Sequence, residues 1–277
     1  LDMKGGIVIA IWVVKALQAL GWAERPVKFI LAGDEDKGHF DADTPQLLIR
    51  LAKGALCCFN METGRVNNDI CIGRKGGGEG ELTVRGTAAH AGNDFLSGRN
   101  AVLEMAYKEI ELAELNDLEL GTTVTPTVIK GGTVPNGIPD HCHLYFDVRY
   151  RKFEEAQRVK EAFERIAAHS HIDGTHTDCI YKEYQVPFDE TPDGIALADF
   201  VAEVSRELDM GDMGKINLGG GSDACYFTIA GVPTICAMGV CGQFNHSSKE
   251  YALVETLYTR AKLLTCAVLV LEKFVQR

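Results

Sequence analysis

The segment from Glu81 to Glu183 predicts strands and helices in the order strand, helix, strand, strand, helix, strand, and this order constrains the fold most. Apolar residues alternate in the strands and recur at helical spacing in the helices. The expected strands are Glu81–Arg85, Thr122–Ile129, His141–Tyr150 and Thr177–Glu183, and the expected helices are Arg99–Leu115 and Phe153–Ala168. This βαββαβ order is that of a ferredoxin-like domain. Glycines cluster just before it and predict a hinge: Gly73, Gly76, Gly77, Gly78 and Gly80.

The flanking segments alternate between helices and apolar strands, which is typical of an α/β fold with a mostly parallel sheet. The expected helices are Lys4–Leu20, Pro45–Lys53, Gly194–Leu208, Ser222–Ala230 and Glu255–Phe274, and the strands are Pro26–Ala32, Ala55–Asn60 and Thr234–Ala237. We therefore expect a discontinuous catalytic domain, residues 1–75 and 187–277, interrupted by an inserted domain at residues 76–186. A chain of 277 residues is long enough for two unequal domains.

Composition excludes several classes of protein. The net charge of -11, without a run of Lys or Arg, disfavours nucleic-acid binding. No apolar run reaches the roughly 18 residues of a membrane span. The nine cysteines are scattered without a CxxC pair, which favours reduced thiols in a cytoplasmic protein. Because the chain begins Leu1-Asp2-Met3 without a signal peptide, we expect it to be a piece of a longer protein.

Acidic and imidazole side chains follow the predicted strands of the flanking segments. The candidates are Asp2, Asp34, Glu35, Asp36, Glu62 and His246. Because open parallel sheets bind ligands beyond the carboxyl ends of their strands, we expect these groups to converge. Converging carboxylates repel one another, and bound cations relieve that repulsion. The pattern predicts a zinc site, in which two ions could form a hydrolytic clamp. Taken singly, the same residues are explained as a helix cap, a solvated acidic turn, a loop charge and a surface histidine.

Three other features are interpreted as structural. His141 and His143 share one face of a predicted strand, which we interpret as an ordinary sheet face. His169 and His171 follow a helix and are expected to interact with its terminal carbonyls. The glycine runs lack the endings of nucleotide-binding loops, so a Rossmann-type nucleotide-binding protein is disfavoured.

Seven motifs in order resemble one family, the twentieth family of metallopeptidases, which includes acetylornithine deacetylase, succinyl-diaminopimelate desuccinylase, aminoacylase and glutamate carboxypeptidase. The resemblance covers nearly the whole chain. The motifs are Asp2-Met3-Lys4-Gly5-Gly6, Gly33-Asp34-Glu35-Asp36, Asn60-Met61-Glu62-Thr63-Gly64-Arg65, Gly86-Thr87-Ala88-Ala89-His90-Ala91-Gly92, Asn136-Gly137-Ile138-Pro139 with Asp147-Val148-Arg149, Gly219-Gly220-Gly221-Ser222-Asp223-Ala224, and His246-Ser247.

The resemblance implies that Asp2 bridges two zinc ions, with Co or Mn as possible substitutes. Glu62 would complete the shell of one ion, and Asp36 and His246 that of the other. Glu35 would be the general base that activates water. His90 of the inserted domain would support the oxyanion in the partner subunit of a homodimer.

The resemblance also implies a substrate that carries a carboxylate, namely an N-acyl amino acid or a short peptide. It assigns the binding of that carboxylate to Asn136 and Arg149, close to a loop of Gly219, Gly220 and Gly221.

The sequence departs from the family pattern in two places. The family's first ligand is a histidine in a His-x-Asp motif upstream of Asp2, before this chain begins. Asp36 stands where the family usually has Glu and is one methylene shorter. We therefore expect the chain alone to hold one metal better than two, at Asp2, Asp36 and His246. The leading hypothesis is a zinc-dependent amidohydrolase of the carboxypeptidase, deacetylase or desuccinylase type, and the alternative is an inactive relative or fragment that acts as a dimeric binding scaffold.

Overall fold

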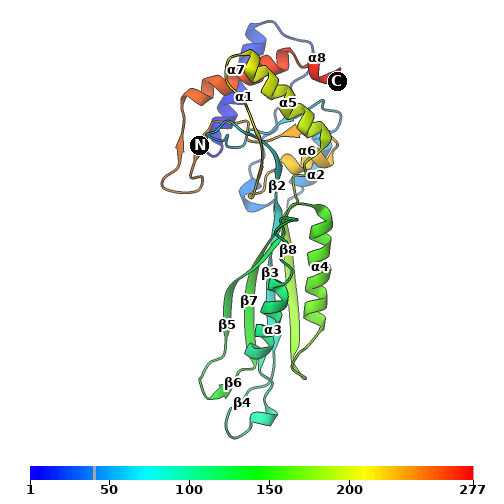
Figure 1. Cartoon of the computed structure of the whole chain (residues 1–277), viewed down its shortest axis with the longest axis vertical. Coiled ribbons are helices and arrows are strands. Elements are labelled where there is room, and N and C mark those ends of the chain that lie inside the picture. Colours follow the sequence, from blue (N-terminus) through cyan, green and yellow to red (C-terminus); the bar gives the residue numbers. More distant parts are fainter. Residues whose placement is uncertain (40–41, 277) are drawn as a thin grey trace. The chain divides into compact units, whose positions relative to one another are not determined.

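The computed structural model in Figure 1 describes residues 1–39 and 42–276. The chain forms two compact units, which are described separately. Unit 1 comprises Leu1–Arg74 and Phe188–Arg277, and unit 2 comprises Lys75–Pro187.

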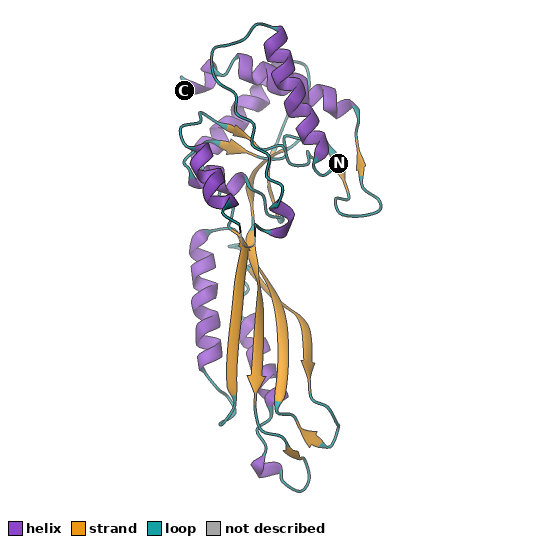
Figure 2. Cartoon of the chain, turned by 180° about the vertical axis from the view of Figure 1, so that it is seen from behind, coloured by secondary structure: helices purple, strands orange, loops and turns teal. Residues whose placement is uncertain are grey.

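Unit 2 has the βαββαβ order that the sequence predicts. Its elements are β3 (Gly76–Arg85), α3 (Ala101–Ala113), β5 (Thr123–Gly131), β7 (His141–Tyr150), α4 (Phe153–Ala168) and β8 (His176–Gln185). The four strands form one antiparallel sheet in the order β5-β7-β3-β8. Both helices pack on the same face, α3 mainly on β5 and β7 and α4 mainly on β8 (Figure 2). Alternate residues of β7 are buried against them, including Leu144, Phe146 and Val148, because successive strand side chains point to opposite faces.

The glycines predicted to form a hinge lie inside strands, on either side of the boundary between the two units at Arg74 and Lys75. Gly73 belongs to β2 (Ile70–Arg74), and Gly76, Gly77, Gly78 and Gly80 belong to β3. A β-carbon at Gly80 would overlap the ring of Phe146 on the neighbouring strand. These glycines therefore admit large side chains from adjacent strands, which is a known use of glycine inside a sheet.

The end of α4 differs from the sequence-based expectation. The Nζ of Lys108, on α3, donates hydrogen bonds to the carbonyls of Ile166 and His169. The ring of His171 instead contacts Glu111 on α3. Among the described residues, it is therefore Lys108 that donates side-chain hydrogen bonds to the carbonyls of Ile166 and His169. His143 contacts Thr83 and Glu81 across the sheet, as expected for a sheet face.

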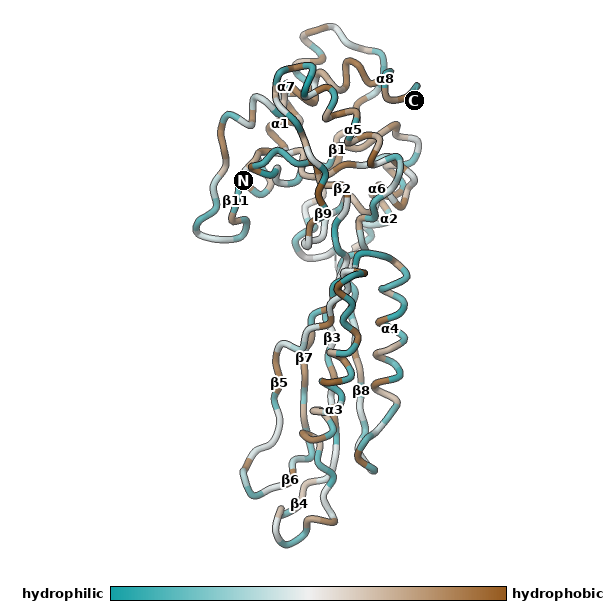
Figure 3. Tube along the Cα trace, viewed as in Figure 1, coloured by the Kyte–Doolittle hydropathy of each residue, from teal (hydrophilic) through white to brown (hydrophobic). Residues whose placement is uncertain are grey.

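Unit 1 is an α/β structure whose strands pair in short parallel segments. Its helices are α1 (Lys4–Ala19), η1 (Glu35–Lys37), α2 (Thr44–Ala52), α5 (Pro192–Glu207), α6 (Ala224–Ile229), α7 (Glu255–Leu269) and α8 (Glu272–Val275). Its strands are β1 (Cys58–Phe59), β2, β9 (Lys215–Leu218), β10 (Thr234–Ile235), β11 (Gly242–Gln243) and β12 (Tyr251–Ala252). Strand β1 pairs with β10 and β2 with β9, both in parallel. Apolar residues of α1, α5 and α7 form the core, and they appear as brown segments in Figure 3.

Strand prediction failed for residues 26–32. This segment forms no strand, and Val27, Phe29 and Leu31 are exposed. A strand needs a neighbouring backbone to complete its hydrogen bonds, and no described strand pairs with this segment. The predicted strand Ala55–Asn60 shortens to β1, β9 was not predicted, and the last long helix ends at Leu269.

Two further observations concern the whole described chain. The described helices include none with both the length and the hydropathy needed to cross a membrane. All nine cysteines are free thiols.

Candidate metal centre

Asp2 and His246 are brought together although they lie at opposite ends of the sequence. Asp2 precedes α1, and His246 lies in the loop between β11 and β12. The Asp2 Oδ2 to His246 Nε2 distance is 2.8 Å. The other carboxylate oxygen of Asp2 is 3.4 Å from the Thr63 hydroxyl, which accepts a hydrogen bond from Asn245. A carboxylate and an imidazole are thus paired at one edge of unit 1.

Glu62 and Glu35 belong to the same electrostatic neighbourhood. Burial raises the pKa of Glu62 to about 8, and the negative charges of Glu35 and Asp2 add to the increase. Burial likewise raises the pKa of Glu35 to about 7, helped by the charges of Asp223 and Asp36. Arg74 opposes both shifts without cancelling them. Burial is thus the main cause of both shifts, and repulsion between neighbouring carboxylates adds to it.

Arg74 was not singled out by the sequence analysis. It ends β2 and donates to the Cys236 sulfur at 3.3 Å and to the Gly221 carbonyl at 3.2 Å. Burial opposes ionisation of the Cys236 thiol, but its contacts with Cys71 and Arg74 outweigh burial and lower its pKa. Arg74 thus holds the Gly219–Gly221 loop beside the acidic cluster. No motif marked it, since a single Arg at the end of a strand has no distinctive pattern.

The sequence analysis also missed His39, which is buried next to the turn that carries Asp34, Glu35 and Asp36. Its Nε2 lies 2.7 Å from Asp223 Oδ1, and its Nδ1 lies 3.0 Å from Asp34 Oδ2. Asp34 also accepts a hydrogen bond from the Thr44 hydroxyl at 2.7 Å. These contacts hold the turn that carries Glu35 against α2 and α6. The available signal was a histidine four residues after Glu35, which is weak by itself.

The donor set fits a divalent metal, although the ligand atoms do not form a closed shell. Carboxylates with an imidazole are common ligands of zinc. Burial and neighbouring carboxylates raise the pKa of the partly buried Glu35 and Glu62, and a bound cation would favour their ionised forms. Asp36 lies beside Glu35 in η1, and its side chain is exposed. Within residues 1–39 and 42–276, three metal-binding atoms lie within 4.8 Å of one another only at Glu111, His169 and His171, in unit 2.

His90 and Asn136 lie side by side in unit 2. Strand β4 (Ala89–His90) pairs with β6 (Gly137–Ile138), and the Ala91 amide donates to the Asn136 carbonyl at 3.0 Å. The Nδ1 of His90 accepts hydrogen bonds from the amides of Gly92 and Asn93, each at 3.1 Å. In the neutral ring Nε2 then carries the proton, so exposed His90 can act as a hydrogen-bond donor.

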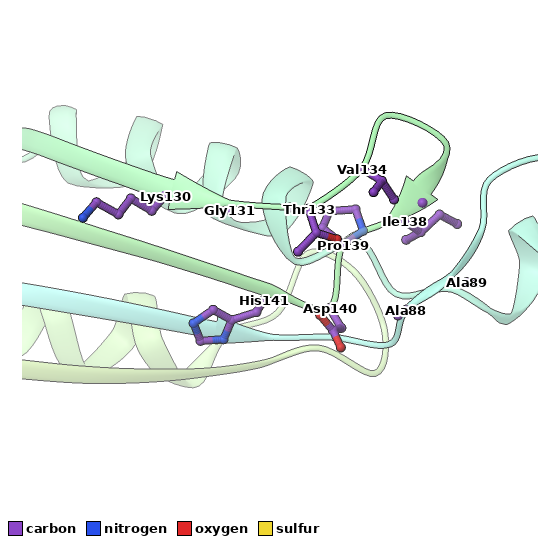
Figure 4. A pocket seen from close by; sticks show the side chains of 12 residues that line it. Ala88, Ala89, Lys130, Gly131, Thr133, Val134, Ile138, Pro139, Asp140 and His141 are labelled. Carbon is purple, nitrogen blue, oxygen red and sulfur yellow. The ribbon is translucent and has the colours of Figure 1, made fainter.

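A pocket of about 470 Å³ adjoins β4 and β6 (Figure 4). It is lined by the ends of β5 and β7 and by the loops around β4 and β6, including Lys130, Thr133, Asp140 and His141. Its lining mixes apolar residues such as Ile138 and Pro139 with these polar groups.

Arg149 is already paired with a carboxylate of its own chain. Its guanidinium donates to both oxygens of Asp147 at 2.9 to 3.2 Å, and it lies 5.3 Å from the ring centre of Tyr184. A substrate carboxylate would therefore have to compete with Asp147 for Arg149.

Comparisons with known proteins agree with this architecture. Residues 72–175 match the M20 peptidase dimerisation domain. The chain is 28% identical to carboxypeptidase G2 of Pseudomonas sp. (strain RS-16) over 271 residues, covering 95% of this chain and 65% of that protein. It is 22% identical to succinyl-diaminopimelate desuccinylase of Ehrlichia ruminantium (strain Welgevonden), covering 95% of this chain and 70% of the relative.

Among solved structures, aminopeptidase PepT of Bacillus cereus superimposes with a TM-score of 0.78 at 24% identity, covering 95% of this chain and 69% of that one. At this identity the likeness concerns the fold. The chain thus spans about two thirds of the length of these relatives. The chain thus contains a segment that matches the M20 peptidase dimerisation domain, and along 95% of its length it is similar to proteins named carboxypeptidase G2 and succinyl-diaminopimelate desuccinylase.

Proposed function

We propose that this chain belongs to an enzyme that hydrolyses an amide bond beside a carboxylate with the help of zinc. The observation that carries the proposal is the convergence of Asp2, Glu35, Glu62 and His246 in unit 1, with carboxyl pKa values raised by burial and by like charge. A cluster of that kind is suited to divalent cations. Family relatives named carboxypeptidase and desuccinylase support the same class of reaction.

The proposed ligands are Asp2, Asp36, Glu62 and His246, with two zinc ions per complete subunit and Co or Mn as alternatives. Bound zinc would polarise the amide carbonyl and lower the pKa of water. Glu35 would take a proton from water and pass it to the leaving nitrogen.

Unit 2 would supply a hydrogen-bond donor and substrate contacts. The proton on His90 Nε2 is available for the oxyanion, which the family resemblance assigns to the partner's site. Asn136, Arg149 and the Gly219–Gly221 loop would hold the carboxylate of an N-acyl amino acid or short peptide. For Arg149 to do so, the substrate carboxylate must displace the Asp147 carboxylate, because both oxygens of Asp147 accept hydrogen bonds from the Arg149 guanidinium.

A homodimer through unit 2 is part of the proposal. Leu103, Tyr107 and Ile110 form an exposed apolar stripe along α3, with exposed fractions of 47%, 42% and 59%. Strand β5, an edge of the sheet, exposes Val128 and Ile129. Exposed sheet edges and apolar patches are common contact surfaces. Free thiols at all nine cysteines favour a cytoplasmic location.

The test uses the full-length protein that contains this chain, supplied with zinc, cobalt or manganese and a panel of N-acyl amino acids and short peptides. Glu35→Gln should abolish turnover while the far-UV circular dichroism and metal content stay unchanged. Glu24→Gln, an exposed carboxylate of unit 1, is the matched control and should behave as the parent does. Normal turnover in Glu35→Gln would refute the proposed mechanism. No hydrolysis of any substrate by the parent protein would favour the alternative, a dimeric binding scaffold.

A further inference from the structure

Three side chains that can bind metal meet in unit 2, and the proposed reaction does not use them. Glu111 lies on α3, and His169 and His171 lie in the loop between α4 and β8. One ligand atom from each lies within 4.8 Å of the other two. The His171 Nε2 is 3.1 Å from Glu111 Oε1, and the two imidazole rings are 4.5 Å apart.

The loop that carries the two histidines is held by buried charges of α3. Glu104 and Lys108 have no exposed surface on their side chains and form an ion pair one helical turn apart. Glu104 accepts hydrogen bonds from the amides of His171 and Ile172, and Lys108 donates to the His169 carbonyl. The backbone of the cluster is therefore fixed before any ligand arrives, as an effective metal site requires.

Glu111 carries an independent sign of a missing ligand. Its Oε1 contacts His171, but its Oε2 is buried and has no hydrogen-bond partner among the described residues. Buried polar atoms are rarely left without a partner, and such an exception calls for an explanation. A bound cation would satisfy this oxygen, since the carboxylate already faces two imidazoles.

We propose that Glu111, His169 and His171 bind a divalent transition-metal ion of the zinc class. Two imidazole nitrogens and one carboxylate oxygen suit Zn²⁺, Co²⁺, Ni²⁺ or Cu²⁺, whereas Mg²⁺ and Ca²⁺ prefer oxygen ligands alone. Zinc bonds of about 2.1 Å in a tetrahedron place ligand atoms about 3.4 Å apart. The His171 to Glu111 pair already has nearly that spacing, so rotation of the imidazoles closes the site, with water as the fourth ligand. The ion would tie α3 to the α4–β8 loop.

Tyr107 supports this assignment because it orients one ligand. Its ring stacks on His171 with a centroid distance of 4.7 Å, so the imidazole keeps its edge toward Glu111. A simpler interpretation is an ordinary histidine–carboxylate contact, such as His176 with Asp178 at 3.1 Å in the same unit. The second imidazole and the unpartnered oxygen of Glu111 distinguish the cluster from that contact.

The test measures Zn²⁺ and Co²⁺ binding to the full chain by calorimetry and absorption spectroscopy. The parent chain should bind one more equivalent than His171→Ala or Glu111→Gln, or bind that equivalent at least tenfold more tightly. It should also show a Co²⁺ absorption band that both variants lack. His176→Ala, which removes another exposed histidine with a carboxylate neighbour, should behave as the parent does. Far-UV circular dichroism checks that each variant folds.

Equal stoichiometry and equal affinity in the parent and in both variants would overturn the proposal. So would an equal loss in His176→Ala, because that result indicates non-specific binding to surface histidines. The inference does not depend on hydrolysis, since Glu35→Gln should retain this metal equivalent even if it abolishes turnover.

Discussion

The buried ion pair of α3 gives the sharpest stability prediction for this chain. Lys108 and Glu104 have fully buried side chains, 3.3 Å apart, and Lys108 also donates to the carbonyls of Ile166 and His169. Lys108→Met keeps the length of the side chain but removes its charge and its donors. The carboxylate of Glu104 then stays buried without a cation, so we expect the free energy of unfolding of unit 2 to fall by about 3 to 5 kcal/mol.

Urea unfolding followed by two signals measures this effect. Both tryptophans, Trp12 and Trp22, lie in unit 1, so their fluorescence reports that unit, whereas far-UV circular dichroism reports both units. Lys108→Met should move the dichroism transition to lower urea and leave the fluorescence transition in place. Lys160→Met, at an exposed position of α4, is the matched control and should change the free energy by less than about 0.5 kcal/mol.

A double variant tests the cause of the loss. Glu104→Gln combined with Lys108→Met removes both charges, and its amide oxygen can still accept from the loop. We expect the double variant to be more stable than the sum of the two single losses by about 1 kcal/mol or more. The reasoning would be refuted if Lys108→Met lowered the free energy of unfolding by no more than the control does. It would also be refuted if the losses of the two single variants were strictly additive in the double variant.

Three further predictions concern other parts of the molecule. Ile110→Asp on α3 should shift the protein from dimer to monomer in light scattering, whereas Leu118→Asp, outside the apolar stripe, should not. An unchanged molecular mass for Ile110→Asp would count against a dimer interface at the apolar stripe of α3. Burial opposes the charge of His39, but its contacts with Asp223 and Asp34 prevail and raise its pKa above 6.5. The stabilising charge of His39 is then fully present below pH 6.5 and is lost as pH rises through the folded pKa. In urea unfolding, the loss of stability caused by His39→Gln should therefore become smaller between pH 6 and 8.5. A loss of stability that does not vary with pH would contradict this assignment. Because the pKa of Glu62 rises to about 8, its ionisation costs stability as pH rises toward 8, and metal-free Glu62→Gln should exceed the parent in stability at pH 9 but not at pH 5.

The sequence predicted the elements of unit 2 well because their hydrophobic patterns are long and local. Helix α4 occupies the predicted residues Phe153–Ala168, and β7 the predicted His141–Tyr150. In both elements apolar residues recur at a regular spacing over ten or more residues, and tertiary contacts reinforce that pattern. The segment 26–32 shows the opposite case, since an apolar run predicts a strand only if another backbone lies beside it.

Motifs in the sequence pointed to the candidate residues of the proposed centre, but not to most of the groups that contact them. Asp2, Glu35, Glu62 and His246 were recognisable from their motifs and their places after strands. Arg74, His39 and the Cys71–Cys236 pair lie in no distinctive pattern and meet their partners only when the chain folds. Asp223, the partner of His39, does lie in a quoted motif, but the motif does not indicate that contact.

The fold class and the division into two units were thus determined by the sequence, which also supplied the candidate acidic residues, because periodicity and motif order are properties of the linear chain. Only the tertiary structure decided that Asp147 occupies Arg149, that Lys108 caps α4, and that Glu111 meets His169 and His171. Lys108 and Glu111 lie on α3, and their partners lie about 60 residues away at the end of α4 or in the loop after it, so only the folded chain brings them together. Asp147 and Arg149 lie two residues apart on β7, and the conformation of their side chains decides that they pair.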